Sequence, residues 1–203
     1  MQIFDFPTFT AEFMPSNSDA FIVANSEMNI SKINGSQRIS ENPGEGWEVN
    51  YKFGVMHPSQ ARAVKGLLQK LRGHKNAVRL LDTNYSHIGA WASGLTVDGA
   101  NQYGLSINIK NAPPNTTIAY ATDRFKLTQV HELTEDAVTN ASGKCTLKLA
   151  NEVREPTTVN QPIITALNQL FMTCRWADPM QIKQFKGRAR LYRNITLDFL
   201  EQR

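Results

Sequence analysis

The stretch from residue 46 to residue 82 changes its hydrophobic period twice, and this constrains the fold more than any other feature of the sequence. In GWEVNYKF, apolar and polar residues alternate, which is typical of a strand with one buried face; the apolar positions are Val49, Tyr51 and Phe53. The next apolar residues recur at steps of three and four, which gathers them on one side of a helix: Ala61, Val64, Leu67, Leu68 and Leu71. An extended run resumes at residues 77–81. The sequence therefore predicts a sheet protein with one helix packed on the sheet.

The two ends of this helix carry recognisable signals. Pro58 suits the first helical turn, where its missing N–H group leaves no hydrogen bond unmade. Gly73 suits the position just past the end, where the chain must turn left-handed, and Arg72 suits the negative end of the helix dipole. No other stretch has helix signals at both ends, so we expect one helix at about 58–72.

Short apolar runs separated by turn residues fill most of the remaining chain. Strands are expected at 21–23, 31–39, 118–120, 125–127, 130–138, 144–149 and 188–200. Asn34-Gly35 is the strongest hairpin signal, and residues 163–176 fit either a strand pair or one short helix. We therefore predict a mainly β fold, a β-sandwich flanked by the helix, with residues 1–203 forming a single domain.

Two segments reach beyond this framework. Residues 1–14 form an N-terminal arm that Pro7 breaks, and its four phenylalanines are more apolar than a free arm needs: Phe4, Phe6, Phe9 and Phe13. We expect these rings to dock either on a neighbouring subunit or on the chain's own sheet. Residues 83–115 read as a long, glycine-containing connection with one embedded strand, and such connections often contact a partner.

Composition sets limits on the kind of protein. The chain is 41% hydrophobic and 20% charged, which is ordinary for a folded soluble protein, and no window reaches the roughly 18–20 apolar residues that a membrane helix needs. The first residues contain Asp5 and no basic region, so we expect no secretory signal and assembly in a cytoplasm. Cys145 and Cys174 are then expected to be buried thiols. The net charge of +4 is concentrated in residues 183–203. This charge fits either a solvated strand face or a surface that binds nucleic acid or an acidic protein.

The usual catalytic and metal-binding patterns are missing from the sequence. The four histidines are scattered without HExxH spacing, and neither a GxSxG elbow nor a phosphate-binding glycine loop occurs. His131 and Glu132, followed by Glu135 and Asp136, form the one acidic–histidine cluster. It fits solvated hairpin charge, because His131 and Glu132 are neighbours on a strand and face opposite sides. We therefore expect no catalytic, cofactor or metal site, and a protein whose work is contact.

The order of motifs carries a resemblance. A tryptophan-bearing strand, GWEVNYKF, precedes a helix ending in LLQKLRG, the short strand AVRLLD and a glycine-rich stretch. A strand pair then leads into SGKCTLKL at 142–149, with Arg154 after it, and the chain closes with LDFLEQ. This pattern, over about residues 46–200, resembles the small tail proteins of tailed bacteriophages, in particular distal-tail or tail-tip adaptor proteins. Members of that family often have Gly-Asp where this chain has Thr122-Asp123, so the turn there is expected to differ.

The resemblance implies a β-sandwich related to the tail-tube fold, repeated as a ring that is usually six-fold. Such a ring lies in the virion tail and joins the tube to the hub or the receptor-binding apparatus, with a lumen through which DNA passes. Its partners would be copies of itself and other tail proteins, including fibre proteins, without membrane insertion. Besides the four phenylalanines of the arm, the proposed contacts between subunits are Tyr85, Trp91 and Tyr103.

Two other classes of function stay open. A glycan-binding β-sandwich module would use Trp91, Tyr85 and Tyr103 as an aromatic platform. A cell-wall hydrolase would use Asp82 or Glu132, although neither has an acid or base partner at a sensible spacing.

Overall fold

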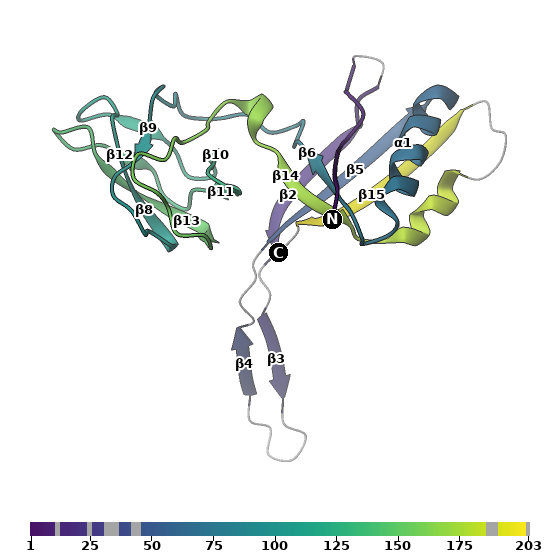
Figure 1. Cartoon of the computed structure of the whole chain (residues 1–203), viewed down its shortest axis with the longest axis horizontal. Coiled ribbons are helices and arrows are strands. Elements are labelled where there is room, and N and C mark those ends of the chain that lie inside the picture. The colour runs from purple at the N-terminus through teal and green to yellow at the C-terminus, as the bar shows by residue number, and fades with distance from the viewer. Residues whose placement is uncertain (11–12, 24–25, 31–36, 42–45, 186–190, 202–203) are drawn as a thin grey trace.

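The computed structural model describes residues 1–203 except 11–12, 24–25, 31–36, 42–45, 186–190 and 202–203. Figure 1 shows two lobes side by side, with a two-stranded hairpin that projects away from both. The expected mainly β fold with one α-helix is confirmed. The chain is built from two lobes, each with its own cluster of buried hydrophobic residues.

Six strands form the main sheet, in the order β1–β6–β14–β15–β5–β2. Their bounds are β1 Ile3–Asp5, β2 Asn17–Val23, β5 Gly46–Met56, β6 Ala77–Leu80, β14 Met172–Trp176 and β15 Tyr192–Glu201. β1 runs parallel to β6, and the other neighbours are antiparallel. We call this sheet, together with the helices that pack on it, the sheet lobe.

The single α-helix, α1, spans Pro58–Leu71, close to the expected 58–72. At its start the backbone N–H of His57 donates to the side chain of Gln60 at 2.7 Å. At its end the left-handed turn begins one residue earlier than expected, because Arg72 as well as Gly73 has a positive φ, 50° and 68°. The apolar stripe predicted from the sequence is buried: Ala61, Val64, Leu67, Leu68 and Leu71.

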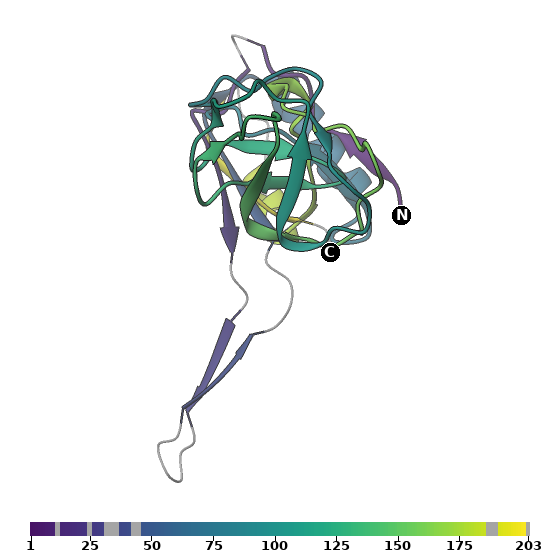
Figure 2. The ribbon, with the colours of Figure 1, turned by 90° about the vertical axis from the view of Figure 1, so that its left-hand side faces the viewer.

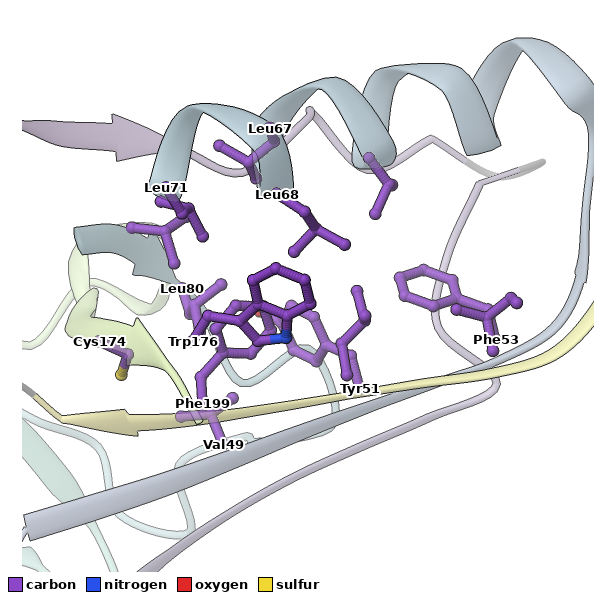
Figure 3. Close-up of a cluster of buried hydrophobic side chains, with 14 of the residues drawn as sticks. Val49, Tyr51, Phe53, Leu67, Leu68, Leu71, Leu80, Cys174, Trp176 and Phe199 are labelled. Carbon is purple, nitrogen blue, oxygen red and sulfur yellow. The ribbon is translucent and has the colours of Figure 1, made fainter. Parts of the chain in front are cut away.

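The core of the sheet lobe lies between α1 and one face of the sheet. Figure 3 shows Leu67, Leu68 and Leu71 of the helix above the side chains of Tyr51, Trp176 and Phe199. The alternating residues Val49, Tyr51 and Phe53 of β5 are all at most 1% exposed, so the period of two read from the sequence places the correct face inward. Two 3₁₀ helices, η1 Leu167–Gln169 and η2 Pro179–Phe185, flank β14.

The second lobe is inserted between β6 and β14, which pair with each other in the main sheet. Its strands are β7 Thr96–Val97, β8 Gly104–Lys110, β9 Thr117–Ala119, β10 Arg124–Lys126, β11 Val130–Glu132, β12 Ala137–Val138 and β13 Cys145–Val153. They pair as β13–β8–β7, β10–β11 and β12–β9. Their inward residues, with Phe125 and Ile107 at 0%, form the second hydrophobic cluster.

The long connection expected at 83–115 contains its embedded strand, as β8, but it is more buried than an assembly loop would be. Leu95 and Val97 and the β8 residues Ile107 and Ile109 are at most 1% exposed, so this segment contributes to the core of the second lobe. β7 has only two residues, which is too short to give a readable alternation. It pairs with β8, the next strand along the chain, and on its other side with Pro162, which is distant in sequence.

The bounds of other strands and helices also differ from those expected from the sequence. β2 begins at Asn17, inside the turn-rich residues 15–20, because it pairs with β5 along its whole length. Residues 163–176 form η1 and then β14, a mixture of the two expected alternatives. Of the strand expected at 31–39, residues 37–39 lie in β4 Gln37–Glu41, which pairs with β3 Ser26–Ile30. Residues 31–36, with the predicted Asn34-Gly35 turn, lie outside the described residues.

Candidate assembly surfaces

The phenylalanines of the N-terminal arm pack on the chain's own sheet. The ring centroid of Phe6 lies 5.2 Å from that of Tyr51, and Phe13 stacks on Phe53 at 5.5 Å. Phe9 contacts both of these arm rings, and Phe4 is half-buried against the same cluster. The structure thus has the second of the two expected arrangements, docking on the chain itself. A contact between these rings and a neighbouring subunit stays a prediction.

The outer edge of β2 has no strand partner among the described residues, although the carbonyl of Ala20 accepts the Arg124 side chain of the second lobe. β2 stands last in the strand order, and among the described residues it pairs only with β5. Its Phe21 is a large apolar side chain with 47% of its surface exposed. An unpaired edge presents a row of N–H and C=O groups that can extend into another strand.

β3 and β4 continue β2 and β5 away from the body of the protein. They pair with each other in register from Ser26↔Glu41 to Ile30↔Gln37. Figures 1 and 2 show this pair clear of both lobes from two perpendicular directions. A two-stranded hairpin without a packed face is at best marginally stable alone in water.

Arg124 of β10 joins the two lobes. Its side chain donates to Glu132 at 2.9 Å, to Asp82 at 2.9 Å and to the backbone carbonyl of Ala20 in the sheet lobe at 3.0 Å. The guanidinium also lies 4.5 Å from the ring of Trp47 and 4.4 Å from the ring of Tyr85. Three of its five N–H donors suffice for these contacts, because each reaches an acceptor on a separate segment. This cluster fixes the second lobe against the sheet.

A second contact at the same junction comes from Trp47 of β5. Its indole N–H donates to the carbonyl of Val130 at 2.9 Å, and Val130 itself packs into the hydrophobic cluster of the sheet lobe. The lobes therefore share both an apolar contact and an ion-paired one. Sequence reasoning missed this junction, because its residues are separated by up to 104 positions along the chain.

The residues considered for an enzyme or a glycan platform belong largely to this junction. Asp82 and Glu132 both bind Arg124, a pairing that their separation in the sequence did not indicate. The hydroxyl of Tyr85 accepts the backbone N–H of Arg124 at 2.6 Å, and burial raises the pKa of Tyr85. One face of the Tyr85 ring is covered by the guanidinium, so it does not form an open platform.

The other two aromatic candidates lie in different surroundings. Trp91 is half-buried, with its ring 5.8 Å from Phe125 and 6.2 Å from His87. Tyr103 is 72% exposed and makes no ring contact with the other described aromatic residues. His87 links this cluster to Tyr85, since its two ring nitrogens lie 2.9 Å from the Tyr85 hydroxyl and 2.6 Å from the carbonyl of Thr165. The structure therefore brings Tyr85 and Trp91 together and leaves Tyr103 apart.

Asp123 organises the turn in which this chain has Thr122 at the position of the glycine in the phage-tail pattern. Its fully buried carboxylate accepts the backbone N–H groups of Ile88, Gly89 and Tyr120 at 2.7–2.9 Å. A Cβ on Gly89 would lie 2.7 Å from this carboxylate and from the backbone of residue 119, so only glycine fits there. Thr122 has a φ of 73°, the left-handed conformation that glycine adopts readily. Threonine thus takes a glycine-like backbone conformation.

His131 corrects the expectation of solvated charge on the β11 hairpin. Its side chain is fully buried, with Nδ1 3.2 Å from the carbonyl of Asn151, and Nε2 has no partner among the described residues. Burial lowers the pKa of His131 to about 4, so the ring is neutral at pH 7. Glu132, its neighbour on the opposite face, is paired with Arg124, whereas Glu135 and Asp136 are exposed, as expected.

Both cysteines are free; Cys174 is buried, as expected, whereas Cys145 is only half-buried. Burial raises the pKa of the Cys145 thiol to about 11 and that of the Cys174 thiol well above its ordinary value. Among the described residues, no group of three His, Cys, Asp or Glu side chains is placed to hold a metal ion. In the same part of the chain, none of the helices has the length and apolar character to cross a membrane.

Comparison with known proteins adds no relative. No protein-family model matches the chain, and no curated protein matches it significantly.

Proposed function

We propose that this protein is a structural subunit of a bacteriophage tail, which assembles with copies of itself into a ring at the distal end. The ring, six-fold in the simplest form, would join the tail tube to the hub or the receptor-binding apparatus and leave a lumen for DNA. The proposal rests on the motif order of the sequence and on the surfaces described above.

The projecting β3–β4 hairpin is the observation that carries the proposal. Two paired strands of five residues each stand clear of both lobes, and two strands alone are at best marginally stable in water. In a ring, a neighbouring subunit would supply a surface for them to pack on. The open edge of β2, which leads directly into the hairpin, offers a second contact of the same kind. When two different patches of identical subunits bind each other, the subunits form a ring if the rotation from one subunit to the next brings the last subunit back to the first.

A hairpin deletion tests the proposal. Val23 and Gly46 are directly paired in the β2–β5 ladder, so replacing residues 24–45 with Asn-Gly closes the two strands with a tight turn. We expect the shortened protein to keep the thermal unfolding temperature of a folded subunit and to lose assembly, measured by sedimentation velocity and electron microscopy. Rings formed equally well by the shortened protein would show that the hairpin does not assemble them.

The glycan-binding alternative has less support. It needs Tyr85, Trp91 and Tyr103 as one exposed platform, whereas Tyr85 is covered by Arg124 and Trp91 packs on Phe125.

A further inference from the structure

A groove runs between β1 and α1, on the side of the sheet away from β2. It consists of two adjoining hollows of about 350 and 420 Å³, which share Phe4 and Lys70 in their linings. Phe4, Pro7, Ala63 and Leu67 give the first hollow an apolar floor. The groove is therefore elongated, with room for an extended segment rather than for one compact small molecule.

The walls of the groove are held in place by Asn76. Its side-chain oxygen accepts the backbone N–H of Gln2 at 3.1 Å, and its amide nitrogen donates to the carbonyl of Lys70 at 2.9 Å. The N–H of Ala77 also donates to the carbonyl of Gln2 at 3.0 Å. β1 and the end of α1 are thus fixed relative to each other, and the groove is formed before any partner arrives.

Gly66 lies in the middle of α1 and lines the groove. Glycine inside a helix is less stable than alanine, so its presence normally reflects a packing need. A Cβ built at Gly66 would meet no other atom within 4 Å, so nothing in the chain itself requires glycine there. The missing side chain leaves space for the close approach of a backbone from outside.

The rim of the groove is basic. Arg62, Lys70, Arg72 and Lys75 line it, all four side chains are exposed, and none forms an ion pair with a described residue. The one carboxylate in the lining, Asp5, is paired with Arg79 at 3.5 Å. The position of Lys70 and Arg72 near the helix C-terminus accounts for part of this charge, but Arg62 lies two turns earlier.

We propose that this groove binds an extended, acidic segment of a partner protein. The outer edge of β1 has no strand partner among the described residues, so the segment can add beside it as a further strand. Acidic side chains would pair with the free cations, and the backbone would pass over Gly66. A nucleic acid fits less well, because the apolar floor gives a charged phosphate backbone nothing to bind.

Fluorescence anisotropy tests this with the full chain and three labelled probes. These are a ten-residue peptide of alternating glutamate and valine, the same peptide with lysine in place of glutamate, and a ten-nucleotide oligothymidylate. We expect saturable binding of the acidic peptide alone, weakening as salt is added. Binding of the oligothymidylate without the acidic peptide, or no saturable binding of the acidic peptide, would overturn the proposal.

Matched variants separate the groove from overall charge. Arg62→Glu with Lys70→Glu should weaken peptide binding about tenfold or more, since two cations become repulsive. Lys148→Glu with Arg193→Glu makes the same change of net charge at exposed positions outside the groove lining and should leave binding within about twofold. Gly66→Ala should weaken binding without lowering the unfolding temperature. Equal affinity of the two double variants would overturn the proposal.

Discussion

Arg124→Ala is the substitution that most sharply tests how the two lobes are held together. The guanidinium lies in a buried site, with its side chain 11% exposed and the carboxylates of Asp82 and Glu132 at 9% and 22%. Alanine would leave both carboxylates without their cation and the carbonyl of Ala20 without its donor. The stacking of the guanidinium on Trp47 would be lost as well.

The expected cost follows from these contacts. Removing one partner of a buried ion pair typically costs about 3–5 kcal/mol, because the remaining charge is buried without compensation. We therefore expect Arg124→Ala to lower the free energy of unfolding by about 4 kcal/mol, a large part of the roughly 5–15 kcal/mol of an ordinary domain. Adding Asp82→Asn and Glu132→Gln should restore part of the loss, since neutral amides are less costly to bury than unpaired carboxylates.

Urea unfolding at pH 7, followed by circular dichroism, measures this directly. Arg79→Ala is the matched control, because Arg79 forms an exposed ion pair with Asp5 at 3.5 Å and should cost less than about 1 kcal/mol. Equal, small losses for Arg124→Ala and Arg79→Ala would refute the view that Arg124 fixes the second lobe on the sheet.

Two further predictions concern the backbone and pH. Thr122 is exposed with a φ of 73°, so Thr122→Gly should raise the free energy of unfolding by about 0.5–1 kcal/mol. Thr128→Gly is the control, at an exposed position without positive φ, and should lower the free energy of unfolding. Equal effects of the two substitutions in denaturant titrations would contradict this. Because the pKa of His131 is about 4 when folded and about 6.5 when unfolded, the unfolded chain binds a proton that the folded chain does not. Stability should therefore fall by up to about 3 kcal/mol as pH drops from 6.5 to 4, and His131→Gln, measured over the same range, should flatten this slope; an unchanged slope would count against it.

The part of the fold that could be predicted is the part governed by local periodicity. The alternation of Val49, Tyr51 and Phe53 and the three- and four-residue steps of α1 each reflect one buried face, so they identify a strand and a helix without knowledge of their neighbours. Most of the short strands expected after residue 115 are present within a few residues, because turn residues separate them. The strand expected at 130–138 is instead two, β11 and β12, which pair in different sheets.

The rest depends on contacts that local patterns do not contain. The two-residue strand β7 is too short to show an alternation, and it also bridges Pro162, far along the chain, so the sequence shows only the β8 strand within residues 83–115. Arg124 lies 42 positions from Asp82 and 104 positions from Ala20 in the sequence, so no local pattern links it to them. His131 looked like surface charge because the sequence shows its charged neighbours but not the Phe125 ring that covers it at 5.5 Å. The division of the buried residues into two clusters is likewise not marked in the sequence, because no clear linker separates them.

The mass of the intact protein in solution tests the central claim, that this subunit is built to assemble with copies of itself. Sedimentation velocity over a range of concentrations, with the particles then imaged by electron microscopy, distinguishes the alternatives. The account predicts a closed ring, with six times the 22.8 kDa of the chain as the expected mass and an open centre in the images. A protein that stays at 22.8 kDa at the highest concentration reached would contradict it.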